Sequence, residues 1–165
     1  MKKVLLYCIA IVLQLIFSTS RSMAVDLFRN GHSDYAIIVD DNASASEQTA
    51  AIELRDYLKQ VGNIKLPIRK TSEAYTGKAI YIGYNAKVGG LIGGYSFKDT
   101  DESFIYMTQN DNLFIFGGRD RGTFYGVLGF LENELGVRWY APDCTIVPHR
   151  AVYLLPALHH SEHPA

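Results

Sequence analysis

The chain has 165 residues, of which 16 are basic and 17 acidic, so its formal net charge is −1 at neutral pH. This length fits one domain, and a hydrophobic content of 48% with 12% aromatic residues excludes a disordered chain. The balanced charge and the lack of a basic run argue against a nucleic-acid partner.

The first 24 residues have the three-part pattern of a secretory signal peptide. Residues 1–3 are a short basic start, residues 4–17 are almost wholly apolar, and Ser22 and Ala24 are small residues suited to a cleavage site. The apolar run is shorter than the roughly 20 residues of a membrane span, so a retained anchor is only the alternative. We therefore expect residues 1–24 to be removed and the protein to be exported to a bacterial periplasm, cell surface or medium, with no membrane partner after cleavage.

Signal removal changes the inventory of the mature chain. It takes away three basic residues and Cys8, which leaves 13 basic residues against 17 acidic ones. Cys144 is then the lone cysteine, so no internal disulfide can form and the domain must be stable through packing alone. We expect Cys144 to be a buried thiol without a catalytic role.

The first half of the mature chain predicts a strand followed by a helix. Residues 35–39 are β-branched and apolar, which is typical of a strand. Ser44 and Glu47 form an S-x-x-E capping box, and apolar residues at helical spacing follow as far as Val61. Gly62 stands where such a helix ends.

Two shorter strands and a loop follow. Residues 66–69 predict an edge strand, because Pro67 cannot donate a ladder hydrogen bond. Residues 78–83 predict a third strand. Residues 89–94 contain four glycines, and we interpret them as a flexible loop.

A hairpin is expected next, over residues 103–108 and 113–116. The intervening residues 109–112 tolerate positive φ and suit the turn. Both strands are apolar on both faces, whereas a sheet with one solvated face alternates apolar and polar residues. Something must therefore cover each face, and a missing partner or domain is a candidate for the second cover.

The last third of the chain predicts a helix over residues 120–135. Gly122, Gly126 and Gly129 indicate that it lies close against a sheet, where a Cβ atom would not fit. Residues 137–140 and 151–155 are short apolar stretches, the first of which predicts a strand, and the tail at 159–165 has no helix or strand pattern.

The order of these elements predicts an α+β fold: a small α/β sandwich in which a mixed sheet has helices on one face.

The run from Gly117 to Gly122 could carry chemistry. A glycine-rich turn before a helix presents free N–H groups, and Arg119 and Arg121 add positive charge, so a phosphate or a sugar carboxylate could bind there. The alternative, which we favour, is a tight turn whose arginines pair with nearby acids or with a neighbouring domain. The spacing matches neither a dinucleotide-binding motif nor a P-loop.

Trp139 and Tyr140 have two interpretations. If exposed, they could stack on sugar rings; if buried, they belong to the core, which is commoner for aromatic residues at a strand end. We favour the core.

No motif predicts catalysis, a metal or a cofactor. The neighbouring carboxylates Asp40-Asp41 and Asp101-Glu102 lie at turns, where Asp forms local hydrogen bonds, and glycoside hydrolysis needs two carboxyl groups facing one another across a substrate. The tail histidines at 159, 160 and 163 lack the supporting partners of a metal site.

The run from residue 113 to 143, with Pro148 after it, resembles the N-terminal domain of bacterial alpha-glucuronidases and the related front domains of glycosidase-like proteins and beta-hexosaminidases. The specific part is G-G-R-x-R-G-x-x-Y-G-x-x-x-F-L-E, from Gly117 to Glu132. The resemblance extends over nearly the whole mature chain.

The resemblance implies a small α/β sandwich that precedes a (β/α)8 catalytic barrel. The family's catalytic carboxylates lie on that barrel, and no position here corresponds to them. The implied organisation is a signal peptide (1–24), an α/β domain (25–158) and a linker towards the barrel (159–165). The implied function is a non-catalytic accessory domain in polysaccharide breakdown, for example of xylan. A free-standing carbohydrate-binding or interaction module is the alternative, and a small independent hydrolase a third hypothesis.

Overall fold

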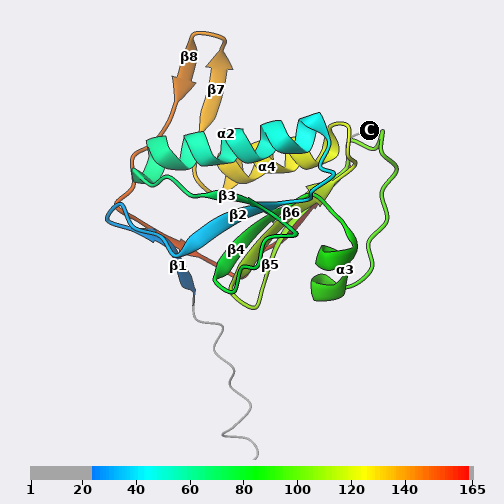
Figure 1. Ribbon diagram of the computed structural model, residues 1–165. Helices are drawn as coiled ribbons and strands as arrows, with labels where there is room; N and C mark the ends of the chain where they lie inside the picture. The colour runs from blue at the N-terminus through cyan, green and yellow to red at the C-terminus, as the bar shows by residue number, and fades with distance from the viewer. Residues whose placement is uncertain (1–23, 164–165) are drawn as a thin grey trace, which may run out of the picture.

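The structure is a computed structural model that describes residues 24–163; Cys8 and residues 1–23 of the expected signal peptide lie outside this range. Figure 1 shows a central sheet with helices on it and a hairpin that projects from one end. The strands of the central sheet are β2 (Tyr35–Val39), β3 (Ile68–Lys70), β4 (Lys78–Ile82), β5 (Phe104–Gln109), β6 (Asn112–Gly117) and β10 (His159–Glu162). The helices are α2 (Ala45–Gly62), α3 (Ala86–Ile92) and α4 (Gly122–Asn133).

The central sheet is mixed, with the strand order β10-β5-β6-β4-β2-β3. Strands β3, β2, β4 and β6 run parallel, while β5 and β10 are antiparallel to their neighbours. This confirms the predicted mixed sheet of a small α+β domain. It also confirms that the strand after Pro67 lies at an edge, because β3 is the last strand in the order.

Helix α2 begins at the predicted capping box. The Ser44 hydroxyl accepts a hydrogen bond from the Glu47 amide at 3.1 Å, and the Glu47 carboxylate accepts one from the Ser44 amide at 2.7 Å. The left-handed residue that ends the helix is Asn63, with φ of 53°, and Gly62 is the last helical residue. The end of the helix is therefore predicted one residue too early. Asn, like Gly, tolerates the left-handed conformation that ends a helix.

Helices α2 and α4 lie side by side on one face of the sheet (Figure 1). The interior glycines of α4 have the predicted role. A Cβ at Gly126 would lie 3.0 Å from a methyl group of Ile115, and one at Gly129 would lie 3.0 Å from the ring of Phe104. The larger core cluster of the domain fills this layer and includes Leu54, Leu58, Ile80, Ile115, Phe130 and Leu131.

The opposite face of the sheet is covered by the chain itself. Residues 89–94, expected as a flexible loop, belong largely to helix α3, whose Asn85 side chain caps it by accepting the Val88 amide at 3.0 Å. The helix and the segment after it bury the second apolar face of the hairpin, including Phe114 and Phe116. The expectation that a missing domain supplies this cover is therefore wrong for these residues.

The tail is also more ordered than its sequence indicates. Residues 159–162 form β10, which pairs antiparallel with β5, so the expectation of a segment without a strand is wrong. The His160 ring stacks on Tyr106 with 4.5 Å between ring centroids. Pairing with a buried neighbour, and not an apolar pattern of its own, makes this polar segment a strand.

Two small sheets lie outside the central one. Strands β1 (Val25–Arg29) and β9 (Val152–Leu155) pair antiparallel, and β7 (Arg138–Ala141) and β8 (Cys144–Ile146) form the projecting hairpin. The predicted strand near residues 137–140 is thus present but stands apart from the central sheet. None of the helices in the described range is long and apolar enough to span a membrane.

Candidate functional site

The carboxyl ends of the parallel strands β2, β4 and β6 meet at one edge of the sheet. The connection leaving β2 leads through α2 to β3 on one side, and the connection leaving β4 leads through α3 to β5 on the other. Ligands of open α/β sheets bind at such a switch point. A pocket of about 150 Å³ lies here, which we call the strand-end pocket, and it is lined by Asp40, Asn42, Glu47, Tyr84, Asn85 and Arg119.

Glu47 is the buried carboxylate of the strand-end pocket. It is only 3% exposed, and its Oε2 atom lies 3.9 Å from Nε of Arg119. Burial raises the pKa of this carboxyl, while the hydrogen bond from the Ser44 amide and the charge of Arg119 act in the opposite direction. The helix cap predicted from sequence is therefore also the central acid of the pocket.

Arg119 joins the glycine-rich turn to the start of α2. Its guanidinium donates to the carbonyl of Asn42 at 2.7 Å, and its own carbonyl accepts the Ser44 hydroxyl at 2.8 Å. With the Glu47 carboxylate nearby, these contacts connect the backbone carbonyl and the guanidinium of Arg119 to the start of α2. The favoured interpretation, an arginine that pairs with a nearby acid, describes this geometry.

The glycines of the turn are required by close packing. A Cβ at Gly118 would overlap the carbonyl group of Asp101, and Cβ atoms at Gly117 and Gly122 would overlap the carbonyl oxygen of Ser103. The amides of the turn that face this side are also used, since Gly118 donates to Ser103 at 3.4 Å. The amides of Asp120 and Gly117 are engaged as well, since they donate to the Asp99 carbonyl at 2.9 Å and to the Thr123 hydroxyl at 3.1 Å, so these three amides are not free to bind an anion.

Arg121 lies on the exposed side of the same turn. Its side chain is 69% exposed and lies 3.4 Å from the carboxylate of Glu102. Contacts with Tyr125 and the charge of Glu102 raise the pKa of this guanidinium. An ion pair of this exposure is weak, so Arg121 remains accessible to a neighbouring molecule.

The strand-end pocket is small and internally satisfied. Its volume is below the roughly 300 Å³ at which ligand pockets begin. Asp40 accepts the Asn42 amide at 2.7 Å, and the Tyr84 hydroxyl donates to Gly93 at 2.9 Å. The contacts of this pocket therefore hold the glycine-rich turn against the start of α2 and leave little room for a ligand.

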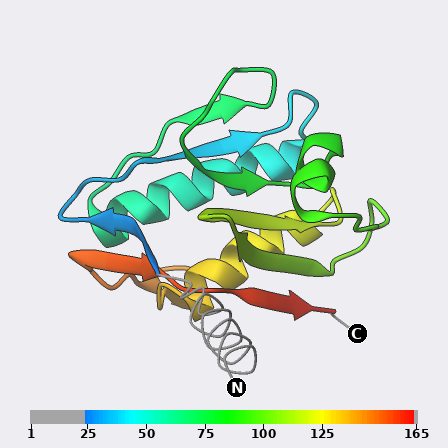
Figure 2. The ribbon, with the colours of Figure 1, turned by 90° about the horizontal axis from the view of Figure 1, so that it is seen from below.

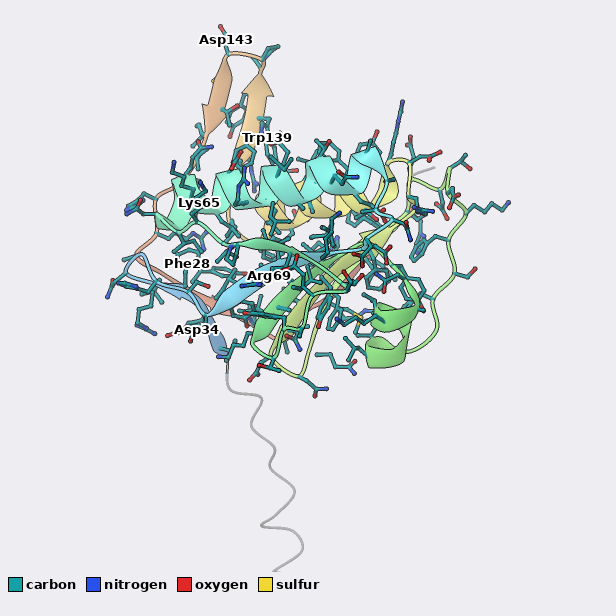
Figure 3. The ribbon with its side chains drawn as sticks, viewed as in Figure 1. Phe28, Asp34, Lys65, Arg69, Trp139 and Asp143 are labelled. Carbon is teal, nitrogen blue, oxygen red and sulfur yellow. The ribbon has the colours of Figure 1, made fainter. Side chains whose placement is uncertain are left out.

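Trp139 and Tyr140 are exposed, in contrast to the favoured interpretation as core. They are 37% and 68% exposed, respectively, on the hairpin β7–β8. Trp139 lies over α2, where its Nε1 donates to the Tyr57 hydroxyl at 2.7 Å (Figure 3). Both residues lie in a short strand, as predicted. That strand, β7, belongs to the projecting hairpin and not to the central sheet.

The four residues singled out from the sequence do not form one site. Arg119 contacts the first turn of α2, whereas Trp139 contacts Tyr57, ten positions after Glu47. That separation corresponds to about 15 Å along a helix. Sugar stacking at the hairpin and anion binding at the turn would therefore be separate events.

Asp40 and Asp101 form the local hydrogen bonds expected of turn residues, whereas Asp41 and Glu102 contact residues distant in the chain. Asp41 accepts hydrogen bonds from Ser72 and Thr71, which lower its pKa, and Asp101 likewise accepts from Ser103. Among residues 24–163, no three His, Cys, Asp or Glu side chains are grouped as metal ligands would be.

Cys144 is exposed, so the expectation of a buried thiol is wrong. It lies on the projecting hairpin, outside the packed core.

The residue order contains a signal for the strand-end pocket. Asp40, Asn85 and Arg119 each follow closely on a predicted strand. Because parallel strands place their carboxyl ends at the same edge of a sheet, a parallel arrangement of these strands predicts that the three side chains lie together.

Comparison with known proteins identifies the fold. No protein-family model and no curated protein matches the chain. Among solved structures, it is similar to a family GH115 4-O-methyl-alpha-glucuronidase with specificity for decorated arabinogalactans, with a TM-score of 0.59 and 14% identity over 85% of this chain. This likeness shows a fold shared with part of a glycoside hydrolase, since the chain spans 18% of that enzyme.

Two further structures are more distant. A GH138 enzyme targeting pectin rhamnogalacturonan II aligns with 59% of this chain and 10% of its own, with a TM-score of 0.41 and 17% identity. The protein CpGH84D aligns with 67% of this chain and 20% of its own, with a TM-score of 0.40 and 11% identity. Both likenesses are too weak to define a common fold.

Proposed function

We propose that this chain is the non-catalytic N-terminal accessory domain of an exported, alpha-glucuronidase-like glycoside hydrolase, and that it packs on a (β/α)8 catalytic barrel in polysaccharide breakdown. The observation that carries the proposal is the alignment with the GH115 enzyme, which includes 85% of this chain and only 18% of the enzyme. In that enzyme the matching region is one part of a larger protein, which supports an accessory role here, and the motif from Gly117 to Glu132 supports the same family.

The chemistry of the described residues agrees with an accessory role. Glycoside hydrolysis requires two carboxyl groups about 5–9.5 Å apart with room for a sugar between them. Glu47 is buried behind Arg119, and the pocket around it is too small for a chain of sugars. The adjacent carboxylates at residues 40–41 and 101–102 are engaged in turns and surface pairs.

The test begins with the coding sequence after Ala165 and the neighbouring genes. We expect a glycosidase barrel in the same reading frame or next to it. That barrel is then produced with and without residues 25–165, and its melting temperature and its activity on glucuronate-bearing oligosaccharides are compared. We expect a lower melting temperature without the domain; no barrel nearby, or an unchanged barrel, would contradict the proposal.

Export is a separate part of the proposal, since it rests on residues 1–24. Mass spectrometry of the protein from the periplasm or medium should give an N-terminus at Val25. An N-terminus at Met1 in the cytoplasmic fraction would contradict it.

A second candidate function, a carbohydrate-binding module, is favoured by the exposure of Trp139 and Tyr140. Exposed aromatic rings can present an apolar face to a sugar. Trp139 is the chain's single tryptophan, so its fluorescence reports directly on the hairpin. A saturable change on titration with glucuronate-bearing oligosaccharides would support this function, and no change at millimolar sugar would exclude it.

A further inference from the structure

A larger pocket lies at the end of the domain opposite the strand-end pocket, beside the last turn of α2, and we call it the basic pocket. Figure 1 and Figure 2 show the turn after β1, the C-terminal end of α2 and the segment before β9 side by side at this end. The pocket has a volume of about 380 Å³, which is within the range of ligand pockets. The polar side chains that line it are those of Asn30, Lys59, Gln60, Asn63, His149 and Arg150.

Backbone hydrogen bonds hold the three segments of the basic pocket together. The amide of Asn30 donates to the carbonyl of Ala151 at 2.6 Å, and the amide of Arg150 donates to the carbonyl of Val61 at 2.7 Å. Asn30 and Asn63 have φ values of 50° and 53°, so the chain turns sharply at both places beside the pocket. The shape of the pocket is therefore set by the backbone of the fold.

The basic pocket has no carboxylate among its lining residues, in contrast to the strand-end pocket. Lys59 and Arg150 are positively charged at neutral pH, and His149 adds an imidazole. Within residues 24–163, none of these three side chains lies within 4 Å of a carboxylate oxygen. Asp56, one turn before Lys59, accepts a hydrogen bond from Arg55 at 2.8 Å, and this bond lowers its pKa more than the charge of Lys59 does. The fold therefore leaves the positive charge of the pocket without a paired acid.

Arg150 is supported by an aromatic ring and not by an acid. The central carbon of its guanidinium lies 5.8 Å from the centre of the Tyr153 ring. A contact of this kind uses the face of the planar guanidinium, whereas its N–H groups point outward in the plane. Arg150 is therefore held in place while its donors stay available to an anion.

The C-terminal end of a helix by itself favours a cation, because its last carbonyl groups carry partial negative charge. In α2, two of these carbonyls accept hydrogen bonds. The Lys59 carbonyl accepts one from the Asn63 amide at 3.0 Å, and the Val61 carbonyl accepts the one from Arg150. Carbonyls with a partner contribute less to the negative end, so the full charges of Lys59 and Arg150 set the sign of the pocket.

The groups beside these charges suit a ligand with hydroxyl groups. Asn30 and Asn63 carry side-chain amides, which both donate and accept, as a hydroxyl group requires. The volume of the pocket is also more than ten times the roughly 30 Å³ of a water molecule, so a small inorganic ion would leave most of it empty.

We propose that the basic pocket binds a sugar that carries an anionic group, with Lys59 and Arg150 at the anionic group and Asn30 and Asn63 at the hydroxyl groups. The positive charge comes from the structure, whereas the choice of a sugar rests on the proposed function in polysaccharide breakdown. The anionic group is a carboxylate, as in a uronic acid, or a phosphate ester, and the test separates these two.

The test is a titration of the chain from Val25 onward, which contains every helix and strand described, followed by amide NMR. Glucuronate and glucose differ only at carbon 6, where one has a carboxylate and the other a hydroxymethyl group. We expect saturable shifts of the amides of Gly31, Asn63 and Ala151 with glucuronate and none with glucose. The dissociation constant should be roughly millimolar, because the charges of the pocket are partly hydrated. Tighter binding of glucose 6-phosphate than of glucuronate would identify the phosphate ester as the preferred group.

Three variants connect the binding to the charges. Lys59→Gln and Arg150→Gln each remove one charge from the pocket and should weaken glucuronate binding about tenfold, while the rest of the amide spectrum shows that the fold is kept. Lys98→Gln removes the same charge from an exposed lysine before β5, at the other end of the domain, and should bind as the wild type does.

Four results would overturn the proposal. They are no shift with either anionic sugar at tens of millimolar, equal affinity for glucose and glucuronate, equal shifts with acetate, and unchanged affinity in both glutamine variants of the pocket. Shifts confined to Trp139 and its hairpin would place the sugar there and would also overturn it. None of these results bears on the barrel, because the barrel is absent from the experiment, and a missing barrel would leave the measured binding as it is.

Discussion

Glu47 shows how one side chain serves two purposes. It completes the capping box of α2 through the Ser44 amide, and its carboxylate is held near Arg119 at the end of the sheet. Both contacts fix the glycine-rich turn to the first turn of the helix. The cost is burial of a carboxylate, which raises the pKa of Glu47.

This pKa shift gives a pH prediction. A carboxyl whose pKa is higher in the folded than in the unfolded protein stabilises the fold below its ordinary pKa of 4.5, and this contribution is lost as the pH rises through the raised value. The free energy of unfolding of the wild type, minus that of Glu47→Gln, should therefore fall between about pH 4 and about pH 7. Urea unfolding at both pH values measures it.

The subtraction removes the effect of other carboxyls. Asp41 and Asp101 have lowered pKa values and make both proteins gain stability as the pH rises, so they cancel in the difference. A difference that grows with pH would mean that the hydrogen bond from Ser44 and the charge of Arg119 outweigh burial.

The glycines of the turn and of α3 give a matched pair of substitutions. Gly118→Ala would place a Cβ against the Asp101 carbonyl group, and such overpacking costs about 1–3 kcal/mol. Gly90, in α3, has open space around its would-be Cβ. Gly90→Ala should be neutral or stabilising by up to about 1 kcal/mol, because Ala is the better helix former.

Chemical denaturation compares the two variants with the wild type. Equal stability of the two alanine variants would show that the close approach at Gly118 is not what selects glycine there.

At the residue scale, prediction succeeded where a local pattern has a local cause. The capping box of Ser44 and Glu47 and the close packing of Gly126 and Gly129 follow from spacing within one helix. The exposure of Trp139 and Tyr140 does not, because it depends on whether any distant segment covers their strand. The same reason explains why Cys144 is exposed and not buried.

At the element scale, long periodic segments were predicted and short ones were not. Helices α2 and α4 and the hairpin of β5 and β6 have strong patterns and were predicted near their observed positions. Helix α3 was missed because its glycines mask a helical segment that is stabilised by its cap and by packing on the sheet. Strand β10 was missed because its four residues become a strand only beside β5.

The hairpin β7–β8 is attached to the body partly through Trp139. An isolated two-stranded hairpin is marginally stable, so the contact of Trp139 with Tyr57, a hydrogen bond of 2.7 Å and an edge-on ring contact, anchors it. Trp139→Ala should cost about 1 kcal/mol or more through lost aromatic packing. Tyr140→Ala should stay within about 0.5 kcal/mol of wild type, because its ring is exposed.

Thermal unfolding followed by far-ultraviolet circular dichroism distinguishes these two variants. If Tyr140→Ala were the more destabilised, the ring would have a partner within the folded domain, and its availability to a barrel or a sugar would be contradicted.

At the scale of the whole molecule, the domain covers both faces of its sheet from its own sequence. Helices α2 and α4 pack on one face, and α3 with the following segment packs on the other. A barrel is therefore not needed to complete the core. Within residues 24–163, the surfaces accessible to a partner include the hairpin β7–β8, the exposed Arg121 and the outer edge of β10.

We propose that this domain works as part of a larger glycosidase. The most direct measurement is the mass of the native polypeptide, captured with an antibody against residues 25–163 and separated under denaturing conditions. We predict a chain several times larger than the 18.4 kDa of this sequence, or a stoichiometric glycosidase barrel released with it. A native chain of 18.4 kDa or less, recovered without any glycosidase, would contradict the account.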